Sequence, residues 1–219
     1  MSIPLPGFSR CRAKGPALVT AIAAIFCLSC SRVLEQTDLE EFVDKGLNSR
    51  PFLSDLSIAS SSGYAFDPGV VFYSGIQIDA DSLAFTPTQG IPGDYIRYAW
   101  NGTSGTTVSS GNTISGLAFT TGANKLVVTV GGEEKRPRQY TFVIMAYTVS
   151  YQANGATSGT VPTQYTGPSG RTTTIAVQGS LANAGLNYRY WYTNQIGSGG
   201  IMYSPGANYT IGSSDLSLY

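Results

Sequence analysis

The chain of 219 residues contains no histidine, and its three cysteines, Cys11, Cys27 and Cys30, all lie within the first 30 residues. A Ser/His/Asp triad and a zinc site built from histidine or cysteine are therefore excluded. The rest of the chain also has no thiol with which to form a disulfide framework. We predict a protein that is not an enzyme and that holds no cofactor and no metal ion.

Charged residues are scarce, at 12% of the chain, and residues 147–219 carry only two arginines and one aspartate. General acid–base catalysis by a pair of carboxylates is impossible in that segment. Three of the 13 basic residues precede residue 30 and none of the 13 acidic residues does, which leaves ten basic against 13 acidic residues in the remainder. A net charge of −3 gives no reason to expect a nucleic acid as partner.

The first 30 residues have the pattern of an export signal. A basic stretch at 10–14 precedes an apolar run from Pro16 to Ser29, and its 14 residues are fewer than the roughly 20 that span a bilayer. The sequence "FCLSC" ends at Cys30 and resembles a bacterial lipoprotein signal, although Cys27 occupies the usual place of a leucine. The resemblance implies that residues 1–29 are removed and that Cys30 is acylated. Ordinary secretory cleavage, with a free thiol at Cys30, is the alternative.

Residues 30–50 are interpreted as the acylated cysteine and a tether. Five of the 13 acidic residues of the chain fall between positions 31 and 50. Thr37 and Glu40 have the spacing of a capping box, which favours a short helix, while a solvated tether is the alternative. Either form would place the following domains away from the membrane.

Residues 51–146 have the pattern of a β-sandwich. Short apolar runs are separated by glycine and proline at intervals near 8 to 12 residues, and we expect Pro68, Pro87 and Pro92 between strands rather than inside them. The order of motifs resembles the bacterial cadherin-like β-sandwich domain, which implies an immunoglobulin-like fold. The motifs are "LSDLSI" at 53–58, "FDP" at 66–68, "GANKLVVTV" at 122–130 and "YTFVI" at 140–144.

Residues 147–219 open with "YTVSYQANGATSGTVP". Tyr147, Val149 and Tyr151 alternate with polar residues as in a half-buried strand, and Asn154-Gly155 and Ser158-Gly159 favour turns. These residues, with "GLNYRYWYT", "GSGGIMYSPGANYTI" and "SDLSLY", are similar to the internalin B-type repeat, which implies a small β-grasp module. Because no glycine, proline or serine separates the two domains, we predict an ordered junction with a fixed angle.

A tyrosine-rich stretch supplies the candidate binding site, since nine of the 14 tyrosines follow residue 146. As a strand, "LNYRYWYT" would place its tyrosines on one face and Arg189 and Trp191 on the other. Tyr190 departs from the repeat family, which has glycine before the tryptophan. We predict a recognition surface for a protein or glycan ligand, with ordinary core and strand residues as the alternative. Its residues are Tyr188, Tyr190, Trp191 and Tyr192.

Two charged motifs remain. Asp79-Ala80-Asp81 could bind calcium through oxygen ligands, but the calcium-binding linker motifs of cadherins are missing, so we interpret both aspartates as exposed loop carboxylates. "GGEEKRPRQ" at 131–139 is interpreted as a solvated turn rather than an anion site.

The sequence as a whole predicts a mainly β, lipid-anchored protein of the cell envelope. We expect it at the cell surface or on the periplasmic face of a membrane, held by its N-terminal lipid, where it serves adhesion or interaction. A structural spacer or assembly subunit and a carbohydrate-binding module are the alternatives.

Overall fold

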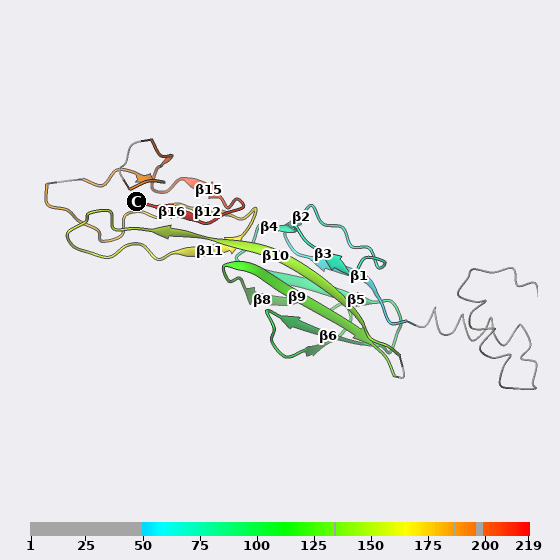
Figure 1. The fold of residues 1–219 in the computed structure, drawn as a ribbon. Helices are drawn as coiled ribbons and strands as arrows, with labels where there is room; N and C mark the ends of the chain where they lie inside the picture. The colour runs from blue at the N-terminus through cyan, green and yellow to red at the C-terminus, as the bar shows by residue number, and fades with distance from the viewer. Residues whose placement is uncertain (1–49, 134, 186, 196–198) are drawn as a thin grey trace, which may run out of the picture. The chain divides into compact units, whose positions relative to one another are not determined.

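The computed structural model describes residues 50–133, 135–185, 187–195 and 199–219. These residues belong to one unit that begins at Arg50, and every regular element within them is a strand (Figure 1). The predicted mainly β fold is therefore confirmed. The predicted signal peptide at 1–29, the acylation site at Cys30 and the tether up to residue 49 lie outside the described residues.

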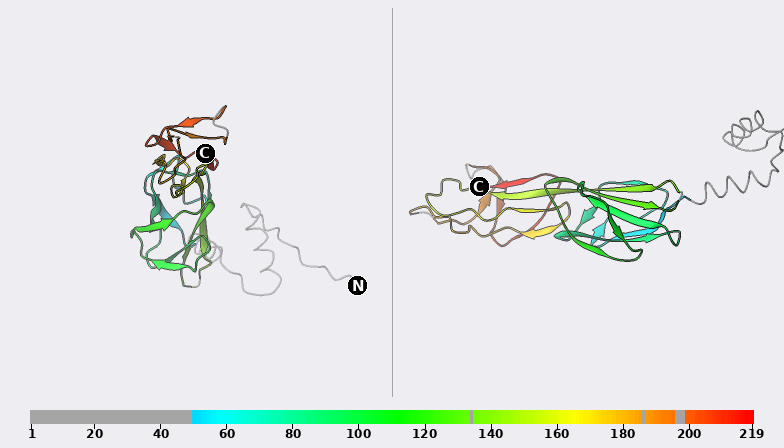
Figure 2. Two further views of the ribbon diagram at one scale, coloured as in Figure 1. Left: turned by 90° about the vertical axis from the view of Figure 1, so that its left-hand side faces the viewer. Right: turned by 90° about the horizontal axis from the view of Figure 1, so that it is seen from below.

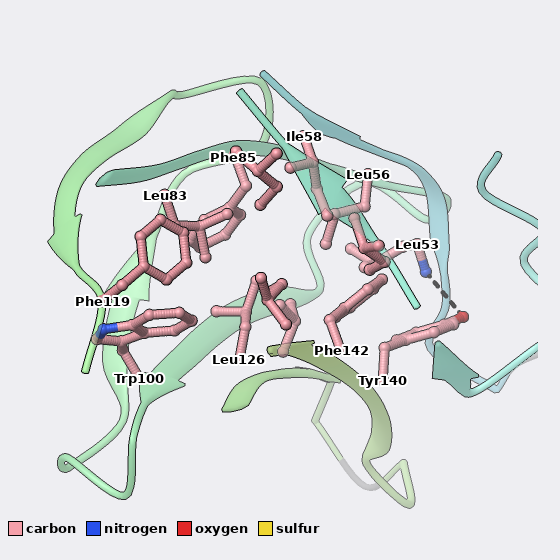
Figure 3. Packing of buried hydrophobic residues seen from close by; sticks show 14 of the residues in the cluster. Leu53, Leu56, Ile58, Leu83, Phe85, Trp100, Phe119, Leu126, Tyr140 and Phe142 are labelled. Atoms are coloured by element: carbon pink, nitrogen blue, oxygen red, sulfur yellow. Dashed lines mark hydrogen bonds between the residues drawn. The ribbon is translucent and has the colours of Figure 1, made fainter. Parts of the chain in front are cut away.

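Two sheets form the β-sandwich. One has the strand order β1 (Leu53–Ile58), β5 (Ser82–Gln89) and β8 (Ile114–Ala118). In the other, β10 (Arg138–Tyr151) pairs with β9 (Gly122–Gly131), followed by β6 (Tyr95–Trp100) and β7 (Thr106–Val108). Apolar side chains from the two sheets meet in one core, in which Leu56 and Phe85 of the first sheet face Leu126 and Phe142 of the second (Figure 3). Burial of these side chains is the main force that holds the sheets together.

Pro87 lies inside β5, so the expectation that it would lie between strands is wrong. It faces Leu56 of β1 across the sheet. The pairing of β5 with β8 ends at Phe85, which makes β5 an edge strand on that side when it reaches Pro87. A proline is tolerated at such a position because no ladder bond to a neighbour is lost there.

Three short strands lie between β1 and β5 in the sequence. β2 (Ser61–Ser62) pairs with β4 (Gln77–Ile78), while β3 (Phe72–Tyr73) runs parallel to β10 beside Thr141 and Phe142. The ring of Tyr73 stacks on that of Phe142 at 4.8 Å between centroids, so β3 is attached to the sandwich by side-chain packing as well as by its backbone.

Residues 152–219 add strands around the far end of β10. β11 (Tyr165–Pro168) pairs with β10 antiparallel and β16 (Leu216–Leu218) pairs with it parallel. Two antiparallel pairs complete this module, namely β12 (Thr172–Thr174) with β15 (Asn208–Thr210) and the hairpin of β13 (Trp191–Tyr192) with β14 (Met202–Tyr203). A second core lies among them, and its buried residues are Val149, Tyr151, Ile175, Leu181, Trp191 and Leu218.

β10 is a single strand that contributes to both cores, and Figures 1 and 2 show it continuing from the sandwich toward the C-terminal strands. The predicted boundary at 146/147 falls inside it. Every second residue from Tyr140 to Ala146 is buried in the first core, whereas Val149 and Tyr151 are buried in the second. The pairing with β9 and β11 shows no register shift, so the two cores use opposite faces of β10.

Of the two turns predicted after β10, the one at Asn154-Gly155 is present, whereas Ser158 forms an isolated β-bridge with Ala182. Asn154 and Gly155 have positive φ angles of 39° and 84°, as two-residue turns require. Gly159 has a φ of 87°, and a Cβ atom at this position would overlap the carbonyl oxygen of Ser180. The predicted strand alternation is also confirmed at Val149 and Tyr151, both of which are buried.

Candidate functional site

Trp191 is a core residue with an exposed fraction of 0%. Its indole Nε1 donates a 2.8 Å hydrogen bond to the carbonyl oxygen of Ala176, and its ring packs against Tyr151 at 4.9 Å between centroids. A side chain with no exposed surface cannot contact a ligand, so Trp191 does not belong to the predicted recognition surface.

Tyr188 packs on the same core. Its ring lies 5.5 Å from that of Trp191, and its hydroxyl donates to the carbonyl oxygen of Ala153 at 3.2 Å. Burial raises the pKa of the Tyr188 phenol above its usual value. The strand predicted through this stretch is wrong for residues 187–190, because only Trp191 and Tyr192 have a ladder partner. Outside a ladder the two-residue alternation does not apply, so Tyr188 and Trp191 can face the same core.

Tyr190 and Tyr192 remain at the surface, just before and within β13, and the other arm of the hairpin carries two exposed apolar residues, one just before β14 and one within it. Tyr192 is half-buried and lies opposite Met202, with 3.7 Å between its hydroxyl oxygen and the Met202 Sδ. Ile201 and Met202 are 63% and 51% exposed, and Tyr190 is also exposed. We call Tyr190, Tyr192, Ile201 and Met202 the hairpin patch. Ile201 and Met202 are not among the residues predicted from the sequence, because "GGIMYSP" has the pattern of the repeat scaffold and carries no local signal of exposure.

Two hydrogen bonds extend the hairpin beyond its ladder, on the side of the loop that connects β13 to β14. The Thr193 amide donates to the Ile201 carbonyl oxygen at 3.0 Å, and the Ile201 amide donates to the Thr193 hydroxyl at 2.9 Å. Beneath the patch, Trp191 is fixed by its own hydrogen bond and packing. The backbone that carries the exposed side chains is therefore held by the Thr193–Ile201 hydrogen bonds and by the packing of Trp191. An ordered backbone loses less conformational entropy when a ligand binds.

The chemistry of the hairpin patch is apolar and neutral. Tyrosine combines a large rigid surface with one hydroxyl, and methionine adapts to irregular partners. Arg189 is the one charged side chain adjacent in sequence, and it is exposed. The arrangement suits desolvated contact with a ligand, and it contains no group that could exchange protons with a substrate near neutral pH.

Asp79 and Asp81 are exposed, as interpreted from the sequence, but both are paired with Arg171. The guanidinium lies 3.0 Å from each carboxylate, and the Tyr165 hydroxyl donates to Asp81 at 2.6 Å. The Thr172 amide and then Arg171 lower the pKa of Asp79, whereas Arg171 and then Tyr165 lower that of Asp81. This cluster joins the loop before β5 to the module beyond β10.

Searches for related proteins give no assignment: no family model and no curated protein matches the chain. Across the part of the chain that the structure describes, no three His, Cys, Asp or Glu side chains are grouped as a metal site. The same residues contain no helix with the length and apolar character needed to cross a bilayer.

Proposed function

We propose that the chain is a non-enzymatic, lipid-anchored interaction module of the bacterial cell envelope, which binds a protein partner through the hairpin patch. The observation that carries this proposal is the exposure of Ile201 and Met202 on the hairpin that also carries Tyr192, which is supported by the buried Trp191. Aromatic residues and methionine are enriched at protein interfaces, and charged residues are depleted at their centres.

Three features of the sequence support the remaining parts of the proposal. The resemblance of the segment ending at Cys30 to a lipoprotein signal supports the anchor. The cadherin-like pattern of residues 51–146 and the internalin B-type pattern of residues 147–219 support a role in adhesion. The shortage of titratable groups supports a function that depends on contact rather than on chemistry.

A structural spacer is the second candidate, because β10 joins the two cores without a linker residue. A spacer would need the rigid joint but no ligand at the hairpin patch. A carbohydrate-binding module is the third, since exposed tyrosine rings can stack on sugars.

Binding measurements with the mature chain can separate these candidates. The immobilised chain is presented with purified envelope proteins, host matrix proteins and a glycan array, in parallel with Met202→Ser and with a control, Val177→Ala, at another exposed apolar residue. We expect a protein ligand whose affinity falls at least ~30-fold in Met202→Ser and is unchanged in Val177→Ala. Glycan signals alone would favour the carbohydrate-binding module, and the absence of any ligand would favour the spacer.

A further inference from the structure

Three arginines converge on a hollow at the edge of the sandwich. Arg50, Arg136 and Arg138 line a depression of about 390 Å³ together with Val71 and Pro137. Arg136 lies in the turn between β9 and β10, and Arg138 is the first residue of β10, whereas Arg50 is the first described residue and precedes β1. The sequence of residues 131–139 predicts a solvated turn, and no feature of it indicates that Arg50 lies beside that turn.

The charge of this group is not neutralised within the described residues, where no carboxylate forms an ion pair with any of the three arginines. Lys135, in the same turn, pairs instead with Asp94 at 2.9 Å. Arg138 is fixed in place, because its Nη2 donates to the Gly69 carbonyl oxygen at 3.2 Å and its guanidinium carbon lies 5.2 Å from the centroid of the Tyr140 ring. Three like charges that form no ion pair with a carboxylate of the described residues favour an anionic ligand.

Exposed apolar side chains adjoin the hollow. Val70, Val71 and Phe72 follow one another in the chain, all three are exposed, and Phe72 is 58% exposed. Their backbone is fixed, since the Thr141 amide donates to the Val71 carbonyl oxygen at 2.8 Å and Phe72 belongs to β3. We call these three residues, with Arg50, Arg136 and Arg138, the basic rim.

We infer that the basic rim is a membrane-contact site, which binds the anionic phospholipid head groups of a bilayer surface. Guanidinium groups bind phosphate in a bidentate manner, and apolar side chains next to a basic cluster can enter the interfacial region of the bilayer. Each arginine near an anionic surface increases binding about fivefold.

The inference rests on the proposed function in one respect, which is that a lipid at Cys30 would keep the chain at a bilayer. The 20 residues from Cys30 to Arg50 span at most about 70 Å when extended, and they join the sandwich at Arg50 itself, a member of the basic rim. Among the surfaces of residues 50–219, the basic rim is therefore separated from an anchor at Cys30 by the fewest residues of chain.

Vesicle sedimentation tests the inference without the lipid anchor. The mature chain from residue 30 is prepared with Cys30→Ser and mixed with vesicles of phosphatidylcholine alone or with added phosphatidylglycerol. We expect binding to the anionic vesicles, a loss of about 25-fold in Arg50→Gln/Arg136→Gln, and a loss below about threefold in Lys125→Gln/Arg189→Gln. The control removes the same charge from exposed residues outside the hollow.

Two further arms complete the test. Phe72→Ser should weaken binding at both low and high salt, because the apolar contact is not screened. Inorganic phosphate should compete no better than chloride of equal ionic strength; specific competition by phosphate would assign the hollow to a free anion and overturn the membrane contact. Equal binding by the arginine variant and its control, or equal binding to neutral and anionic vesicles, would also overturn it. Since Cys30→Ser removes the site of the acyl anchor from every sample, these results do not depend on whether Cys30 is acylated in cells.

Discussion

The indole nitrogen of Trp191 lies 2.8 Å from the carbonyl oxygen of Ala176, to which it donates a hydrogen bond. This contact ties the hairpin of β13 and β14 to the segment that follows β12. It also allows Trp191 to be buried, since a buried indole N–H needs an acceptor and the Ala176 carbonyl oxygen supplies one.

Replacement of that donor should reduce stability. We expect Trp191→Phe to lower the free energy of unfolding by about 1–3 kcal/mol, because the Ala176 carbonyl oxygen loses its partner and the smaller ring leaves space in the core. Chemical denaturation measures the change. Tyr188→Phe, which removes only a 3.2 Å hydrogen bond to Ala153, is the control and should cost about 1 kcal/mol or less. Unchanged stability of Trp191→Phe would contradict the core role of the indole.

Tyr190 should behave as a surface residue. We expect Tyr190→Gly to leave the module folded while the affinity for the protein ligand falls by at least ~2 kcal/mol, the usual threshold for an interface hot spot. Calorimetric binding and thermal unfolding are measured on the same preparation. A clear fall in melting temperature without a specific loss of ligand would favour the spacer over the interaction module.

The Arg171 cluster should contribute a small, pH-dependent stabilisation. Asp79 and Asp81 have lowered pKa values in the folded state, so their contribution is complete above their unfolded pKa near 4 and is lost as the pH falls through the lower folded values. We expect Arg171→Gln to lower the melting temperature by at most ~3 °C at pH 7, because these groups are exposed and screened. Thermal unfolding from pH 7 to pH 2.5 should show this difference disappear in acid. A difference that persists at pH 2.5 would point to packing by Arg171 rather than to its charge.

Two glycines of the loop after β10 offer a matched comparison. Gly155 and Gly159 both have positive φ, but only at Gly159 would a Cβ atom meet neighbouring backbone, that of Ser180. We expect Gly159→Ala to cost at least ~2 kcal/mol and Gly155→Ala about 1 kcal/mol, measured by denaturant unfolding. Equal costs at the two positions would mean that the approach of Ser180 does not constrain the loop.

Local pattern was sufficient where a residue belongs to a ladder or a tight turn. The sequence predicts the burial of Val149 and Tyr151 because apolar and polar residues alternate around them. It predicts the turn at Asn154-Gly155 because these two residue types tolerate positive φ. It failed at Trp191, because the residues before it leave the ladder and no local signal marks that departure.

Contacts between residues far apart in the sequence could not be predicted from local sequence patterns. Arg171 contacts Asp79 across 92 positions of sequence, and Arg50 lines the same hollow as Arg136 because β1 and β10 begin at the same end of the sandwich, where the Leu53 amide donates to the Tyr140 hydroxyl. From the sequence alone, a charged residue has many oppositely charged residues with which it could pair at such distances along the chain. Only the packing of the sheets selects among them.

The change of buried face along β10 limits which insertions and deletions the chain can accept. One residue added between Ala146 and Val149 would turn Val149 and Tyr151 toward the other side of the strand, and the second core would lose both side chains at once. Two added residues would restore the side while displacing the pairs with β11 and β16. Length differences among natural variants of this protein should therefore accumulate in the loops after Tyr151 and be absent from these few positions of the strand.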